Sequence, residues 1–310
     1  SKDDYSMVKK YVLNDAALYG DNRPKIWVHS KYEVNARKWK NFQSRNSTDL
    51  NQPYLYITIQ SIVNHCGDDF HICLIDDDTF AKLIPTWDID LSITPEPMRS
   101  RHRDIAMLQL VYMYGGIIMP NSMLCLKSMH DLYETSFQEN KPFIFEKYRR
   151  STRGEIFVPD MKMMGAKKHD PIVQEMIEHL NTLERAGHYT IETNVLGEME
   201  SWCASKIKSQ EMTLYDGNAI GIKTNIGKPI LLEHLMSDGF LDVEDAQLYG
   251  INIPSNELLI RPKFSWFAIL PYQDCLQAKT ILSKYMSSSM VDSVRSFYNH
   301  RKENCKMIAI

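Results

Sequence analysis

Apolar residues in the first ninety positions follow two alternating patterns, short continuous runs and helical spacing. Residues 25–29 and 70–75 form continuous runs, which predict buried strands. Residues 54–65 place apolar side chains at helical spacing, and a glycine soon afterwards ends that helix. A short helix follows the second strand, after an acidic turn. This alternation of strands and helices predicts an α/β sheet with parallel strands.

The next apolar stretch has the layout of a helix, a strand and a turn. Residues 101–114 form an apolar helix with a carboxylate, Asp104, in its first turn, and Gly115 is a suitable cap for its end. A short strand over residues 117–119 runs into the turn Pro120-Asn121-Ser122. Ligands of open α/β sheets bind beyond the carboxyl ends of the strands. We therefore look for candidate chemistry near this turn.

The second half of the chain is less regular. We expect a strand at residues 142–145, a hairpin-like pair of strands around residues 156–164, and helices near 171–185 and 195–208. No linker or repeat interrupts the pattern. The sequence therefore predicts one domain over residues 1–310, with a lead-in helix in residues 1–22 and a C-terminal elaboration.

Composition excludes several classes of protein. The 310 residues are 44% hydrophobic and carry 36 basic against 39 acidic side chains, a net charge of −3. These values are typical of a globular chain and argue against a disordered tail, a fibre or a generic nucleic-acid binder. The six cysteines have no Cys-x-x-Cys spacing, which argues against a zinc knuckle. We expect most of them to be reduced and buried, although their even number leaves disulfides open.

The sequence indicates no membrane span or signal peptide. The longest apolar stretch, residues 105–119, is interrupted and shorter than the roughly 20 residues that a bilayer requires. The first ten residues lack the apolar segment of a signal peptide. Because the chain begins at Ser1 without Met, the interpretation that an upstream segment carries a membrane anchor stays open, and the sequence does not determine the compartment.

Three features together resemble a known family of enzymes. Asp104, Gly115-Gly116-Ile117 and the strand Lys25-Ile26-Trp27-Val28 are similar to the motifs of DXD-type glycosyltransferases of the capsular-polysaccharide and initiating-mannosyltransferase kind. The resemblance implies a GT-A-like fold, a mixed and mostly parallel sheet with helices on both faces. It also implies a nucleotide-sugar-binding half in residues 23–126 and an acceptor-side half in residues 127–310.

The resemblance further implies an activity and its substrates. A hexose would pass from a UDP- or GDP-sugar to a glycan or protein acceptor, with retention of the anomeric configuration. Two positions depart from the family pattern. Met107 stands where the family has an arginine, and Pro120-Asn121-Ser122 stands where it has the DXD. A DXD holds Mn²⁺ or Mg²⁺ through carboxylate oxygens, and these ligands are missing at this position.

These departures leave three interpretations open. The chain can be a catalytically inactive protein that uses the fold for structure, assembly or binding. It can transfer sugar without a metal if cations stabilise the diphosphate, for which the basic run at 147–153 with Arg149 and Arg150 is a candidate. A solvated loop is the alternative interpretation of that run. Finally, Asp76 and Asp78 of the triplet Asp76-Asp77-Asp78 are weak candidates for metal ligands, although aspartate triplets also serve as turns and helix caps.

Several single residues complete the predicted donor site, each with a structural alternative. Trp27 would stack on the base or pack in the core. His29 would reach a phosphate or be a satisfied polar group at a strand end. The other candidates are Asp104 for the ribose or sugar, Asn121 and Ser122 for the diphosphate, and Trp266 as a cover for the pocket.

Two further groups of residues favour structural interpretations. Met161, Met163 and Met164 fall where relatives make acceptor contacts, with core packing as the default. Glu198 and Glu200 indicate a solvated helix face rather than an acid–base pair. No hydrolase, P-loop or dinucleotide-binding motif occurs in the chain.

Overall fold

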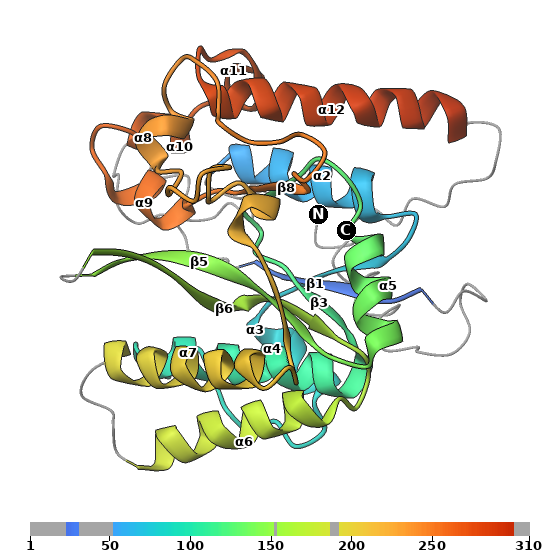
Figure 1. The fold of residues 1–310 in the computed structure, drawn as a ribbon, viewed down its shortest axis with the longest axis vertical. Helices are drawn as coiled ribbons and strands as arrows, with labels where there is room; N and C mark the ends of the chain where they lie inside the picture. The colour runs from blue at the N-terminus through green and yellow to red at the C-terminus, as the bar shows by residue number, and fades with distance from the viewer. Residues whose placement is uncertain (1–22, 31–51, 152–153, 187–191, 301–310) are drawn as a thin grey trace.

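A computed structural model describes residues 23–30, 52–151, 154–186 and 192–300 (Figure 1). Its centre is a six-stranded sheet in the order β2-β1-β3-β6-β5-β7. The first three strands run parallel, β6 is antiparallel to β3 and β5, and β7 is parallel to β5. The strands are β1 (Lys25–His29), β2 (His71–Ile75), β3 (Gly116–Ile118), β5 (Phe143–Ser151), β6 (Gly154–Ala166) and β7 (Thr213–Tyr215).

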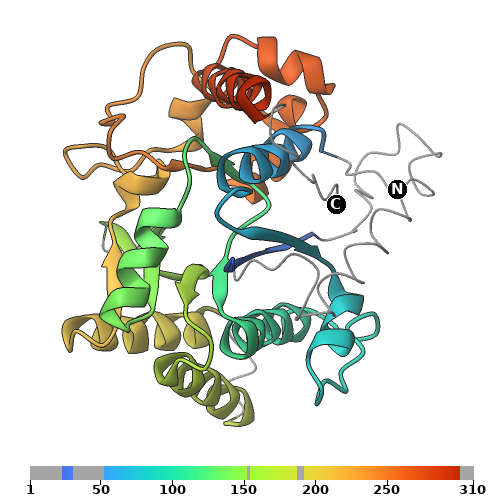
Figure 2. The ribbon, with the colours of Figure 1, turned by 90° about the vertical axis from the view of Figure 1, so that its right-hand side faces the viewer.

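Helices cover both faces of this sheet. In Figure 1, one layer lies below the sheet and contains α3 (Asp77–Leu83), α4 (Met98–Tyr114), α6 (Pro171–Arg185) and α7 (Glu192–Lys208). The upper layer, above the sheet, contains α2 (Tyr54–Cys66) and, over it, α12 (Ile281–His300). Helix α5 (His130–Glu139) stands beside the right-hand end of the sheet in this view, and its Tyr133 packs in one core cluster with α2 and β1. Figure 2 shows α12 stacked on α2 at one face, and α4 beside α6 at the other. The mixed α/β class is confirmed, and this layering is compatible with a GT-A-like fold.

The remaining elements extend the upper layer. A second, two-stranded sheet pairs β4 (Met123–Cys125) with β8 (Gly250–Asn252). Short helices follow along the chain, namely η2 (Gly217–Ile220), α8 (Leu232–Leu235), α9 (Ser255–Ile260), α10 (Ser265–Ala268) and α11 (Tyr272–Gln277). No helix of the described residues is both long enough and apolar enough to cross a membrane.

The Gly115-Gly116 break is required by the close approach of two strands. Gly116 has φ 110°, and a Cβ at this position would lie 2.1 Å from the carbonyl oxygen of Lys25. Only glycine accepts both that backbone conformation and that contact. The pairing of β1 and β3 therefore depends on this residue, and Ile26 and Val28 of β1 are buried as the sequence predicted.

The second half corrects two expectations. Residues 156–164 are not a hairpin-like pair, because they lie within the single strand β6, and the hairpin is made by β5 and β6 together. The basic run is not a solvated loop, because residues 147–151 continue β5. The pairing register of β5 and β6 shifts between Ile144 and Phe145. Because β3 pairs only with residues 164–166 of β6, the part of β5 that pairs with residues 154–160 reaches beyond the end of β3. The predicted lead-in helix in residues 1–22 lies outside the described residues.

The connections place several helix starts at one edge of the sheet. His29 and Ile75 are paired at the ends of β1 and β2, whereas Gly116 at the start of β3 lies beside Lys25 at the start of β1. Since α4 runs into β3 through Gly115, its first turns lie at the edge where the parallel strands end. We call this edge the carboxyl edge.

Candidate functional site

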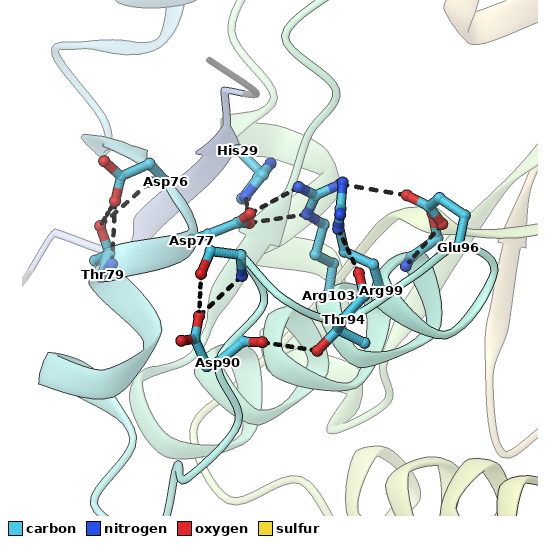
Figure 3. A network of polar contacts seen from close by, with 11 residues as sticks. His29, Asp76, Asp77, Thr79, Asp90, Thr94, Glu96, Arg99 and Arg103 are labelled. Atoms are coloured by element: carbon cyan, nitrogen blue, oxygen red, sulfur yellow. Dashed lines mark hydrogen bonds and ion pairs between the residues drawn. The ribbon is translucent and has the colours of Figure 1, made fainter. Parts of the chain in front are cut away.

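Three polar side chains from separate elements meet at the carboxyl edge (Figure 3). Asp77, in the first turn of α3, accepts two hydrogen bonds from Arg103 of α4, at 2.8 Å to Oδ1 from Nε and 2.6 Å to Oδ2 from Nη2. His29, the last residue of β1, places its Nε2 2.9 Å from the same Oδ1. The parallel fork from Arg103 is the geometry that guanidinium–carboxylate pairs favour.

The charge of Asp77 is fixed by these contacts. Partial burial raises the pKa of this carboxyl, but hydrogen bonds and charge from His29 and Arg103 outweigh it and hold the pKa well below its usual range. Asp77 is therefore ionised under ordinary conditions. The carboxylate in turn accepts a hydrogen bond from Nε2, and the ring of His29 lies stacked on Phe80 with the centroids 5.6 Å apart. The hydrogen bond and the stacking together hold the ring of His29 in one orientation.

The loop before α4 supports the network. Arg103 Nη1 also lies 3.9 Å from Oε1 of Glu96, and Arg99 Nε donates to the carbonyl of Thr94 at 2.9 Å. Figure 3 shows these side chains gathered around the first turns of α4. Arg103 itself is 7% exposed, so its pairing with Asp77 takes place mostly out of water.

A second buried arginine lies two residues earlier on the same helix. Arg101 is also 7% exposed, and its Nε and Nη2 are buried without a hydrogen-bond partner in the part of the chain that the structure describes. Asp104 is half-buried in the next turn and lies on the same helix. Met107, at the position of the family arginine, is buried in the core below the sheet.

The turn after β3 also lies at the carboxyl edge, and it does not fit a metal. The backbone oxygen of Asn121 accepts a 2.6 Å hydrogen bond from the hydroxyl of Thr58, and Ser122 is buried. Pro120 has no side-chain ligand, and the other two are neutral. In the described ranges, no group of three His, Cys, Asp or Glu side chains is placed to hold a metal ion. The donor set at this turn therefore does not suit Mn²⁺ or Mg²⁺.

The weak prediction that Asp76 and Asp78 bind a metal is replaced by other roles. Asp76 caps α3, because its Oδ1 accepts hydrogen bonds from the backbone nitrogen of Thr79 at 3.1 Å and from its hydroxyl at 2.9 Å. Asp78 is exposed on the first turn of the helix. The middle residue of the triplet, Asp77, is the one that takes part in the site.

Trp27 does not present its ring to a nucleotide. The side chain is fully buried, its Nε1 donates a 2.9 Å hydrogen bond to the carbonyl of Gly115, and its ring packs against Tyr114 at a centroid distance of 5.8 Å. The stacking role is therefore corrected to the core role, which suits a tryptophan in a strand with neighbours on both sides.

The basic run is tied to helix α7. Lys147 Nζ lies 3.3 Å from Oε1 of Glu200, and Arg149 Nη1 contacts the other oxygen of the same carboxylate. Glu200 is 8% exposed, so the prediction of a solvated face is wrong at this residue, whereas Glu198 is exposed as predicted. Arg150 lies in the same strand. The run thus contributes ion pairs that hold β5 against α7.

Other predicted residues lie apart from the His29–Asp77–Arg103 network. Trp266 is on α10, 44% exposed, with its ring edge-on to Phe267 at 5.7 Å. Met163 and Met164 are fully buried, which agrees with core packing. The five cysteines in the described residues are buried free thiols, as expected, and Cys305 lies outside those residues.

The sequence interpretation missed Asp77, Arg101 and Arg103. Their signal was present but weak, since Asp77 stands in the acidic triplet and the two arginines flank Asp104 in the order Arg-His-Arg-Asp. Such charges at the start of a helix are ordinarily solvated, so burial distinguishes them only in the folded chain.

Comparison with known proteins gives little further information. No protein-family model matches the chain, and no curated protein matches its sequence. Among solved structures, a chain described as PaToxG glycosyltransferase aligns over 67% of this chain and 80% of its own length, with a TM-score of 0.36 and 9% identity. A similarity this low carries no argument, so the assignment of the fold rests on the sheet itself.

Proposed function

We propose that this chain binds a sugar nucleotide at the carboxyl edge of its parallel strands and transfers the hexose without a metal held at the turn after β3. The acceptor is a glycan or a protein, and the resemblance implies retention of configuration. The observation that carries the proposal is the meeting of His29, Asp77 and Arg103, the residue before Asp104, at the carboxyl edge of the parallel strands. Ligands of open α/β sheets bind at such an edge.

The chemistry of the donor suits these groups. A nucleoside diphosphate leaves with additional negative charge, which a metal or fixed cations must stabilise. Since the residues after β3 do not suit a metal, a cationic side chain of the edge that no carboxylate neutralises takes that role in the proposal. Asp104 accepts hydrogen bonds from hydroxyl groups of the ribose or hexose, and the side chain of Asn121 faces the diphosphate.

Thermal unfolding with donors tests the proposal. We expect a UDP- or GDP-sugar, and not a CMP-sugar, to raise the unfolding temperature equally with and without Mn²⁺. A ligand at a hundredfold excess over its Kd stabilises the folded state by about 2.7 kcal/mol. The variant Asp104→Asn should lose this response, whereas Asp274→Asn, an exposed carboxylate of α11, should retain it. Absence of any response to all three donors would contradict the proposal.

A second function has its own support. Pro120, Ser122 and Met107 replace groups with which the resembling enzymes act, which favours a protein that binds the donor but does not transfer sugar. Both functions predict the same thermal response. They differ in turnover, because only a transferase slowly hydrolyses its donor when no acceptor is present. Release of free hexose, measured by chromatography over hours, separates them.

A further inference from the structure

Arg101 carries a buried charge that no hydrogen bond from its Nε or Nη2 balances within the described residues. Its side chain is 7% exposed, so these two nitrogens are also shielded from water. A guanidinium stays protonated in proteins and cannot become neutral to escape this cost. Burial of a charge without a partner is strongly unfavourable. The arrangement is explained if an anion from outside the chain completes it.

The position of Arg101 brings that anion to the carboxyl edge. Arg101 lies on the same face of α4 as Ile105 and Leu108, one and two turns further along, which are both buried in the core. Helical side chains lean towards the N-terminus of their helix, and for α4 that end lies at the carboxyl edge. This lean brings the side chain of Arg101 towards the edge where β1 and β2 end.

Two neighbours define what the site can accept. Asp104 is three residues further along the helix, so its Cβ lies roughly 5–6 Å from that of Arg101. Arg103 points to a different side, because residues two apart do not share a helix face, and its fork is already used by Asp77. Arg103 Nη1 is also buried without a hydrogen-bond partner among the described residues, but Arg103 is paired with Asp77, whereas no carboxylate of those residues pairs with Arg101 next to Asp104.

We propose that Arg101 binds the diphosphate of the donor through its guanidinium fork and supplies the positive charge that carboxylate-bound metal would otherwise supply. Bidentate bonds from a guanidinium suit phosphate oxygens, and they are stronger when water is excluded. This inference rests on the proposed function for the nucleotide, whereas the binding of a diphosphate group can be tested separately with inorganic pyrophosphate.

The first experiment compares the purified chain with Arg101→Met, which has similar volume and no charge. In buffer without multivalent anions we expect Arg101→Met to unfold at a higher temperature than the wild type, because a buried unpaired charge is removed. Pyrophosphate should stabilise the wild type and leave Arg101→Met unaffected. The Kd of Arg101→Met for pyrophosphate, measured by calorimetry, should be at least about tenfold higher than that of the wild type, since a lost charge-assisted hydrogen bond is worth about that factor.

Two further variants serve as controls. Arg99→Met removes the same charge from the same helix, at a side chain that bonds to the carbonyl of Thr94, and its Kd for pyrophosphate should stay within about twofold of the wild type. Arg101→Lys keeps the charge but loses the fork, and its Kd should fall between those of wild type and Arg101→Met. An equal loss in Arg99→Met would show a general effect of net charge and overturn the assignment.

Other outcomes separate this inference from the proposed function. A wild type that ignores pyrophosphate, or one that responds as strongly to inorganic phosphate, overturns the diphosphate assignment even if sugar nucleotides bind. A wild type that responds to pyrophosphate through Arg101 but to none of the donors supports the anion site and contradicts the proposed function.

Discussion

The carboxyl edge and the β5–β6 hairpin contain the same types of charged residue but differ in how their cations are paired. At the hairpin, Lys147 and Arg149 contact Glu200, and Lys223 donates to Glu146 at 2.6 Å, so each of these cations has a carboxylate from a neighbouring element. At the edge, Asp77 pairs with Arg103 and His29, while Arg101 is left with unpartnered nitrogens among the described residues.

The difference indicates which cluster is structural and which can bind. A cation that a carboxylate already neutralises offers little attraction to an added anion, whereas a buried cation without hydrogen bonds gains from one. Lys223 is a cation of the first kind, because its hydrogen bond to Glu146 neutralises its charge. Glu146 is itself held in place, since it also accepts a hydrogen bond from the backbone nitrogen of Gly217 at 2.8 Å. The sequence marks both clusters as basic and does not separate them.

The largest expected effect comes from Asp77→Asn. The change leaves the buried Arg103 opposite a neutral group, and it removes the acceptor that orients His29. Breaking a buried pair costs about 3–5 kcal/mol, and because the Asp77 side chain is 30% exposed we expect about 2–3 kcal/mol, measured by urea unfolding. Asp78→Asn, the exposed neighbour, should change stability by less than about 0.5 kcal/mol.

The same variant tests the assigned charge. The pKa of Asp77 in the folded chain is depressed, so its contribution is fully present above the pKa of an unfolded aspartate, about 4, and is lost as pH falls towards the lower folded value. The stability difference between wild type and Asp77→Asn should therefore be constant near neutral pH and shrink below about pH 4. A difference that does not change with pH would mean that the carboxylate charge is not what stabilises the cluster.

A smaller effect is expected for Glu200→Gln at the hairpin. The carboxylate is buried, but the side chains of Lys147 and Arg149 are 33% and 42% exposed. Water can therefore solvate their charges when the carboxylate is lost. We expect a loss of about 1–2 kcal/mol in urea unfolding and no change in the response to pyrophosphate. Glu198→Gln, exposed on the same helix, is the matched control and should be neutral. A larger loss than in Asp77→Asn would reverse the order of the two regions.

The sequence predicted those parts of the fold that depend on local periodicity. Strands β1 and β2 and helices α2 and α4 lie close to where their apolar patterns place them. The length of β5 was missed, because its outer half is rich in basic residues and gains its structure from pairing with residues 154–160 of β6. Such pairing depends on the partner strand and leaves little signal within the segment itself.

The candidate site was predicted in place but not in detail. The edge near Asp104 was expected, whereas the contact between Asp77 and Arg103 joins residues 26 positions apart and is set by the packing of α3 on α4. Trp27 shows the opposite case. Its sequence motif matched a base-stacking residue, but neighbours on both sides of β1 and the carbonyl of Gly115 bury it completely. Burial is a property of the assembled layers, and a motif does not report it.

The smallest expected effect is the sharpest test of the comparison. Arg149→Gln removes a cation that is 42% exposed and shares Glu200 with Lys147, so its loss should cost less than about 1 kcal/mol in urea unfolding. Its Kd for pyrophosphate should equal that of the wild type. If Arg149→Gln weakens the binding of pyrophosphate and Arg101→Met does not, the basic run and not the carboxyl edge holds the anion, and the roles assigned to the two regions are exchanged.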